Sequence, residues 1–188
     1  MPLPRPFALM RNAMLIAALG LAQPAQAQTL TPHQMTGRGY AYFIGDGVAQ
    51  SDSEALRWFR AAAAAGDAQG MANLGSMYRT GRGVAQSDSE AVRWYRAAAA
   101  AGNARGMYNL GWMYDQGRGV ARDPGLSADW ILQSGQGYAN LVDDPTDLSP
   151  DTLRVIQQAL RNAGYYTGAL DGVFGPASLA ALYAFDNR

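Results

Sequence analysis

The sequence predicts an all-α protein, a short α/α solenoid of helix-hairpin repeats followed by a small helical domain. Residues 45–114 contain nearly the same stretch twice, and Trp58, Trp94 and Trp130 recur every 36 residues. After residue 142 the repeat stops, and beyond a linker two helical patterns flank a glycine-rich segment. A period between 20 and 50 residues is typical of stacked supersecondary units, none of which buries its apolar face alone.

The N-terminus, residues 1–27, has the pattern of a secretory signal peptide. Arg5 and Arg11 precede an apolar run over residues 13–22, and an Ala-x-Ala site ends at Ala27, after which we expect cleavage. A run of about ten apolar residues is too short for a bilayer core that needs about 20. We therefore expect no stable membrane insertion after cleavage, and a periplasmic or secreted protein.

Composition excludes several classes of function. The 15 basic and 15 acidic residues leave no net charge, and the arginines are spread along the chain, so no nucleic-acid partner is expected. The absence of cysteine excludes a disulfide framework, a lipoprotein anchor and thiolate chemistry.

The sequence also predicts a protein that is not an enzyme. A hydrolase needs a nucleophile with a base, a metal, or paired carboxylates in a cleft. The only histidine, His33, lies beside Pro32 at a predicted helix start, which favours a surface position. No acidic cluster has ligand spacing, so we expect no catalytic residue, no metal and no cofactor.

The first helix of a repeat is predicted over residues 68–79. Its apolar residues recur at spacings of three and four, on one face of a helix, and the Gly-x-Gly after it ends the helix. These residues are Met71, Leu74, Met77 and Tyr78.

The second helix of a repeat begins at a capping box, Ser87-x-x-Glu90, in which the serine accepts from the helix start and the glutamate reaches back. The box recurs as Ser51-x-x-Glu54, and Asp123-Pro124 replaces it in the third copy. Alanines allow close packing, and one large aromatic residue per repeat is expected to fill the space between layers. The predicted buried stripe comprises Ala91, Trp94, Ala98 and Ala101.

These features resemble the Sel-one-like repeat family, relatives of the tetratricopeptide repeat. The matching residues are Leu74-Gly75-x-Met77-Tyr78, the Gly-x-Gly-Val turn, the Ala-x-x-Trp that opens the second helix and the Ala-Ala-x-x-Gly that follows it. The resemblance places a repeat domain at residues 31–142, with about three units of which the first and last are imperfect. It implies an adaptor or scaffold with a protein partner.

A comparison of the two complete first helices points to a contact surface. They differ at four positions spaced i, i+3, i+7 and i+10 on one face, where Gln69, Ala72, Ser76 and Arg79 correspond to Arg105, Tyr108, Trp112 and Asp115. We predict that this face binds an unidentified envelope protein, since exposed aromatics near an arginine are typical of interfaces. In the alternative, Tyr108 and Trp112 pack against the adjacent helix or the C-terminal segment. The predicted surface comprises Tyr40, Arg105, Tyr108, Trp112 and Asp115.

A charged, proline-containing linker is predicted over residues 143–148. Ser149-Pro150 then caps a helix that Gly164 ends, and Pro176 begins a second helix. The predicted order is helix, glycine-rich loop, helix.

Residues 149–188 resemble the small three-helix peptidoglycan-binding domain found at the ends of many cell-wall enzymes. The motifs are Gln157-x-x-Leu160, Gly164-Tyr165-Tyr166-x-Gly168 and Asp171-Gly172-x-Phe174-Gly175, whereas Asp186 stands where the family has Gln. The resemblance implies peptidoglycan binding, which Asp186 is expected to weaken. If the resemblance is set aside, the same residues are explained by structure alone, as a turn and as part of a hydrophobic core. The implied binding residues are Tyr165, Tyr166, Asp171, Gly172, Phe174 and Gly175.

Together these patterns predict an exported scaffold that binds peptidoglycan through its C-terminal domain and presents the repeats to a protein partner. A pure protein-interaction adaptor, whose C-terminal segment only caps the solenoid, is the alternative, and an accessory subunit of an envelope enzyme is a third reading. A domain of about 40 residues and fewer than three good repeats are each marginally stable. We therefore expect the C-terminal helices to dock on the third repeat.

Overall fold

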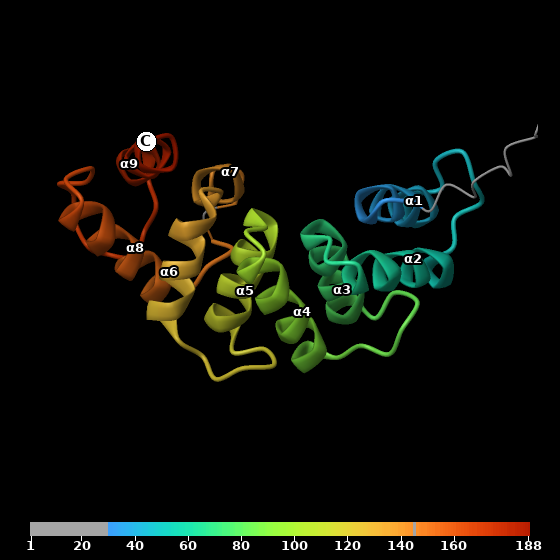
Figure 1. The fold of residues 1–188 in the computed structure, drawn as a ribbon. Helices are drawn as coiled ribbons and strands as arrows, with labels where there is room; N and C mark the ends of the chain where they lie inside the picture. Colours follow the sequence, from blue (N-terminus) through green and yellow to red (C-terminus); the bar gives the residue numbers. More distant parts are fainter. Residues whose placement is uncertain (1–29, 145) are drawn as a thin grey trace, which may run out of the picture. The chain divides into compact units, whose positions relative to one another are not determined.

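The computed structural model describes residues 30–144 and 146–188, and the predicted signal peptide lies outside the described residues. Within these ranges the chain is all-helical (Figure 1), and three consecutive helix pairs form the predicted solenoid. None of the described helices is long and apolar enough to cross a membrane. The pairs are α1 (Pro32–Ile44) with α2 (Asp52–Ala64), α3 (Ala68–Thr80) with α4 (Asp88–Ala100), and α5 (Ala104–Gln116) with α6 (Pro124–Ser134).

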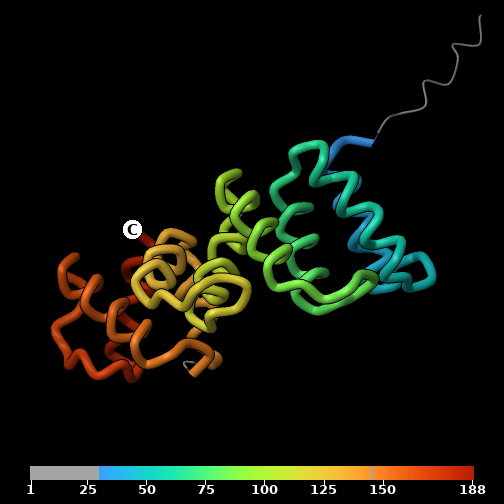
Figure 2. Tube along the Cα trace, turned by 90° about the horizontal axis from the view of Figure 1, so that it is seen from below, coloured from blue at the N-terminus to red at the C-terminus, as the bar shows by residue number. Residues whose placement is uncertain are grey.

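The C-terminal part contains a short helix α7 (Gly137–Leu141), then α8 (Pro150–Asn162) and α9 (Pro176–Asp186). The helix, loop, helix order predicted from the sequence is confirmed. Helix α8 packs on α6 of the last repeat, and α9 packs on α7. Figure 2 shows this succession from α1 to α9 along the Cα trace. The third helix packed in this region, α7, comes before the predicted linker.

The helix caps follow the sequence in most details. The Ser51, Ser87, Asp123 and Ser149 side chains each accept a hydrogen bond from the backbone three residues on. The prediction that each glutamate side chain accepts from the backbone N–H of the capping serine is wrong, because the backbone N–H groups of Ser51 and Ser87 donate to the carbonyl oxygens of Tyr42 and Tyr78. Glu54 and Glu90 instead accept from Arg57 and Arg93, at 2.8 and 2.7 Å, because an arginine one turn along the helix offers a charged donor.

The two helices of each repeat touch at a glycine. Gly39, Gly75 and Gly111 of the first helices face Phe59, Tyr95 and Ile131 of the second helices. A Cβ at Gly75 would lie 2.7 Å from the Tyr95 ring, and Tyr95 is fully buried. The predicted stripe is confirmed at Ala91 and Ala98, which are fully buried, and wrong at its other two positions. Trp94 is only partly buried and Ala101 is exposed, because the ring of Tyr95 fits the space that the glycine leaves.

Each Gly-x-Gly loop connects the two helices of one repeat, and the second and third loops also contact the preceding repeat. Arg82 pairs with Asp52 at 2.5 Å, and Arg118 pairs with Asp88 at 2.9 Å, so each loop is tied to the start of the second helix one repeat earlier. The second glycine of each loop has a positive φ, and a Cβ at Gly119 would clash with the carbonyl oxygen of Asp88. The loop motif thus has a packing role between repeats.

The last repeat and the C-terminal helices share one hydrophobic core. Tyr108 and Ile131 of the repeat belong to the same buried cluster as Ile156 of α8 and Leu182 of α9. The expected docking on the third repeat is confirmed. The cluster comprises Tyr108, Ala128, Ile131, Leu141, Leu148, Leu153, Ile156, Leu160, Tyr166, Phe174, Ala181 and Leu182.

The glycine contact predicts an asymmetric response to alanine. Gly111→Ala should lower the free energy of unfolding by about 1–3 kcal/mol, because the new Cβ would lie 2.9 Å from the Ser127 carbonyl oxygen, which moves only with α6. Gly37→Ala, exposed on α1 with nothing within 4 Å of its Cβ, should raise it by about 0.5–1 kcal/mol. Urea denaturation followed by circular dichroism measures both. Equal effects of the two substitutions would contradict the role of the close contact.

Candidate functional site

Asp115, at the end of α5, holds the start of α8. Its carboxylate is 1% exposed and accepts from the backbone N–H of Ser149 at 3.1 Å, from the Ser149 hydroxyl, and from the Thr152 hydroxyl at 2.5 Å. A negative charge at a helix N-terminus is also favoured by the helix dipole. Asp115, predicted for the partner surface, is thus engaged within the chain, and we call this group of contacts the Asp115 latch.

Tyr108 and Trp112 bind the segment that leads to this latch. The Tyr108 hydroxyl and the Trp112 indole N–H each donate to the Asp147 carboxylate at 3.1 Å. Burial, followed by the Asp147 charge, raises the pKa of Tyr108 far above its usual value, so its hydroxyl remains a donor. Tyr108 is 6% exposed and packs against the C-terminal segment, as in the alternative left open by the sequence, whereas Trp112 is only partly buried.

Tyr40 and Arg105 lie together at a separate hollow of about 150 Å³. Tyr40 is half exposed on α1, and Arg105 reaches the hollow from α5, two repeats along the chain. The sequence reading missed the remaining lining residues. One available signal was Ser76, a small residue where the next repeat has Trp112. The hollow, which we call the Arg105 hollow, is lined by Tyr40, Phe43, Phe59, Asn73, Ser76 and Arg105.

In the C-terminal domain a buried glutamine holds the glycine-rich loop. The Gln157 side chain is fully buried, accepts from the Gly172 N–H at 2.9 Å, and donates to Asp171 and to the Val173 carbonyl at 3.0 Å each. Gly172 has φ +74°, and a Cβ there would clash with the Pro150 carbonyl oxygen, so only glycine fits. The turn motif therefore depends on a side chain from α8.

Some of the predicted peptidoglycan-binding residues are buried, and others are exposed on the surface of the loop. Tyr166 and Phe174 are 7% and 5% exposed, and the Tyr166 hydroxyl donates to the Ala169 carbonyl at 2.8 Å. Gly172 is also buried, and Gly175 is partly buried. Tyr165 and Asp171 are exposed. Hydrogen bonds from Gln157 and the Val173 N–H lower the pKa of Asp171, so this surface group is anionic at neutral pH.

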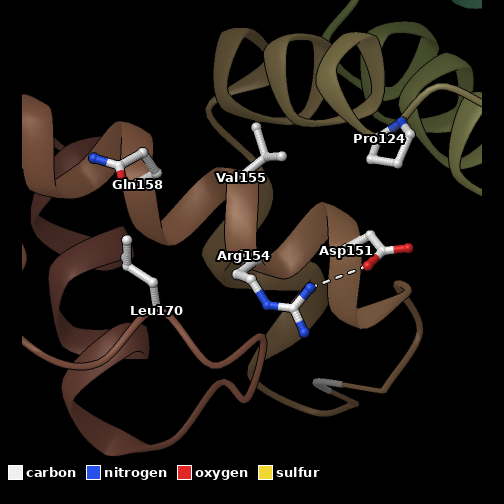
Figure 3. A pocket seen from close by; sticks show the side chains of 6 residues that line it. All are labelled: Pro124, Asp151, Arg154, Val155, Gln158 and Leu170. Carbon is white, nitrogen blue, oxygen red and sulfur yellow. Dashed lines mark hydrogen bonds and ion pairs between the residues drawn. The ribbon is translucent and has the colours of Figure 1, made fainter.

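Two hollows border this domain. The smaller, about 290 Å³, contains two of the predicted residues, Gly172 and Phe174, beside the exposed Val173. The larger, about 460 Å³, contains none of them; Figure 3 shows its six lining side chains, with a hydrogen bond of 3.1 Å from Arg154 to Asp151. The larger hollow is lined by Pro124, Asp151, Arg154, Val155, Gln158 and Leu170.

Asp186 ties α9 to α7. One carboxylate oxygen accepts from the Tyr138 N–H at 2.8 Å, while the other is buried without a hydrogen-bond partner among the described residues. Burial raises the pKa of the Asp186 carboxyl, although the Tyr138 N–H and Arg188 favour the charged form. The residue that departs from the family pattern thus contacts the chain's own backbone.

The described residues include no group of three His, Asp or Glu side chains placed to hold a metal ion. The side chain of His33 is 88% exposed on α1, the surface position expected from the sequence.

Comparison with known proteins identifies two kinds of unit. The Sel1 repeat matches residues 35–67, 68–103 and 104–136, and a putative peptidoglycan binding domain matches residues 149–188. A Sel1 repeat protein from Oxalobacter formigenes is 36% identical over 60% of this chain and 88% of that chain, with a TM-score of 0.52. No curated protein matches this chain.

A second solved structure is c5321, a protective antigen of uropathogenic Escherichia coli strains with an SLR fold. It is 27% identical, with a TM-score of 0.59, over 83% of this chain and 30% of that chain. The chain therefore spans less than a third of the length of that antigen.

The Asp115 latch predicts a large effect of one buried carboxylate. Asp115→Ala should lower the free energy of unfolding by about 2–4 kcal/mol, because it leaves the Ser149 N–H and the Thr152 hydroxyl without their charged acceptor. Asp143→Ala, which removes an exposed carboxylate of the linker before α8, is the control. It should change the free energy of unfolding by less than about 0.5 kcal/mol. Thermal and urea denaturation measure both, and similar values would show that the latch does not hold α8.

Asp186 predicts a pH-dependent effect. Its raised pKa means that the folded chain holds this proton more tightly, so stability is lost as the pH rises through the folded-state pKa. Asp186→Asn, which keeps an acceptor for Tyr138, should be more stable than wild type at neutral pH. The difference should vanish below the unfolded-state pKa of about 3.9. Melting temperatures across this range test it, with the exposed Asp129→Asn as control; a pH-independent difference would contradict the assignment.

Proposed function

The chain belongs to the Sel1 repeat family, and on that premise we propose that it is an exported, non-catalytic scaffold of the cell envelope. Sel1 repeats suggest protein–protein interaction, and the C-terminal domain suggests peptidoglycan binding. Domains of both kinds are typically non-catalytic. A peptidoglycan ligand and the signal-peptide pattern that ends at Ala27 both support a periplasmic or secreted location.

The observation that carries the peptidoglycan function is the match of a putative peptidoglycan binding domain to residues 149–188. The folded loop supports it, since Gln157 fixes the backbone of the Asp171-Gly172 turn in one conformation. A fixed loop binds without an ordering cost.

We place the ligand at the smaller hollow beside this loop. Gly172 and Phe174 line it, and Val173 contributes a side chain that is 65% exposed. An apolar surface next to backbone groups suits the face of a sugar ring or an extended stem peptide. In this arrangement Tyr166 supports the loop, while Tyr165 and Asp171 lie on its exposed side.

A second candidate function, an adaptor whose C-terminal segment only caps the solenoid, is favoured by one observation. Residues 149–188 share their core with the last repeat, so the domain has a stabilising role whether or not it binds a ligand. The two functions differ in whether the chain binds isolated cell wall.

Co-sedimentation with peptidoglycan sacculi tests both candidates. Wild type should sediment, and Val173→Asp should weaken binding about tenfold or more, because a charge would be placed against the ligand. Val155→Asp probes the larger hollow, and Val48→Asp, equally exposed at 37% but on a repeat loop, is the matched control. Both should sediment like wild type.

The other outcomes assign the function differently. Loss of sedimentation in Val155→Asp alone would move the ligand to the larger hollow. Wild-type protein that stays in the supernatant would contradict peptidoglycan binding and leave the adaptor function.

A further inference from the structure

The Arg105 hollow contains a guanidinium that is not paired with a carboxylate within the described residues. Arg105 is partly buried, and this burial lowers the pKa of its guanidinium. Its one hydrogen bond among the described residues goes to the side-chain amide oxygen Oδ1 of Asn73, a neutral acceptor, and its Nε is buried without a partner. None of the ion pairs in the described ranges involves Arg105. A desolvated cation without an anion favours an anionic ligand.

The rest of the hollow fits a carboxylate next to an apolar group. Its lining includes Ser76, the half-exposed Tyr40, Phe43 and Phe59, and no Asp or Glu of the described residues lines it. Its volume of about 150 Å³ is below the 300–1,000 Å³ range of small-molecule and cofactor sites. The occupant is therefore a small part of a larger partner.

The next repeat shows the same helix face already occupied by an acidic segment. There Tyr108 and Trp112 donate to Asp147, and the following Leu148 is buried in the cluster that contains Tyr108. One repeat earlier the corresponding residues are Ala72 and Ser76, and Ser76 is one of the residues that line the hollow. The chain thus binds its own Asp-Leu segment at one repeat and has an open, cationic hollow at the preceding one.

We propose that the Arg105 hollow binds an extended peptide of a protein partner through a carboxylate beside an apolar residue. This inference rests on the protein-interaction part of the proposed function. The carboxylate belongs to an acidic side chain or to a chain terminus. In the bound state it accepts from the terminal nitrogens of Arg105, while the apolar residue packs on Tyr40 and Phe43.

The test selects peptides from a displayed library of random sequences against the full mature chain. We expect enrichment of peptides with Asp, Glu or a terminal carboxylate next to an apolar residue. Synthetic versions with a free or an amidated C-terminus distinguish the two sources of carboxylate, and Asp→Asn or Glu→Gln versions test the charge. Calorimetry with these peptides measures affinity.

Three variants of the chain assign the binding to the hollow. Arg105→Gln, which introduces the residue that the preceding repeat has at this position, should weaken binding at least tenfold. Ser76→Trp, which introduces the residue of the following repeat, should block it by filling the hollow. Arg96→Gln removes an exposed arginine of α4 and should bind like wild type.

The outcomes separate this inference from the peptidoglycan function. It is overturned if no peptide is enriched, if the enriched peptides lack a carboxylate, or if Arg105→Gln binds them as wild type does. Arg105→Gln should sediment with sacculi unchanged. Loss of that sedimentation would assign the hollow to peptidoglycan and overturn the peptide site, whereas failure of peptide binding alone leaves peptidoglycan binding intact.

Discussion

The close approach of two helices at one glycine determines the architecture of each repeat. Because Gly75 has no side chain, the Tyr95 ring lies directly on the backbone of α3, and the same contact recurs at Gly39 and Gly111. This contact sets the face of each first helix that turns toward its partner. The adjacent face of the first helix is thereby left for other uses, and it is the face on which the repeats differ in sequence.

That second face is used in two ways within this chain. At the last repeat it holds the chain's own C-terminal segment, through Asp147 on Tyr108 and Trp112 and through the Asp115 latch. At the middle repeat small side chains leave the Arg105 hollow open. The same helix face thus attaches the C-terminal domain at the last repeat and, in our proposal, receives a partner at the middle repeat.

The attachment also explains how a domain of 40 residues is held. The C-terminal helices complete the core of the last repeat, where Ser127 and Ser134 replace the alanines of the earlier copies. A domain of about 40 residues is marginally stable by itself, and docking adds buried apolar surface. Capping and the proposed peptidoglycan binding meet in this segment, since Leu148 and Leu153 belong to the shared core and also line the smaller hollow.

The helices, their caps and the repeat were determined by the sequence alone, because periodic apolar residues, Ser and Asp caps and terminal glycines act over a few residues. The fully buried aromatic was missed by one position, because Trp94 and Tyr95 are neighbouring large aromatic residues and the contact with Gly75 is tertiary. On the helix face where the repeats differ in sequence, the tertiary structure alone decided which residues contact other parts of the chain. Asp115 and Tyr108 are buried by residues more than 30 positions away, whereas Arg105 is not paired with any carboxylate of the described chain. Long-range contacts of this kind leave no local pattern in a sequence. The Arg105 hollow could therefore be distinguished from the occupied face of the last repeat only in the folded structure.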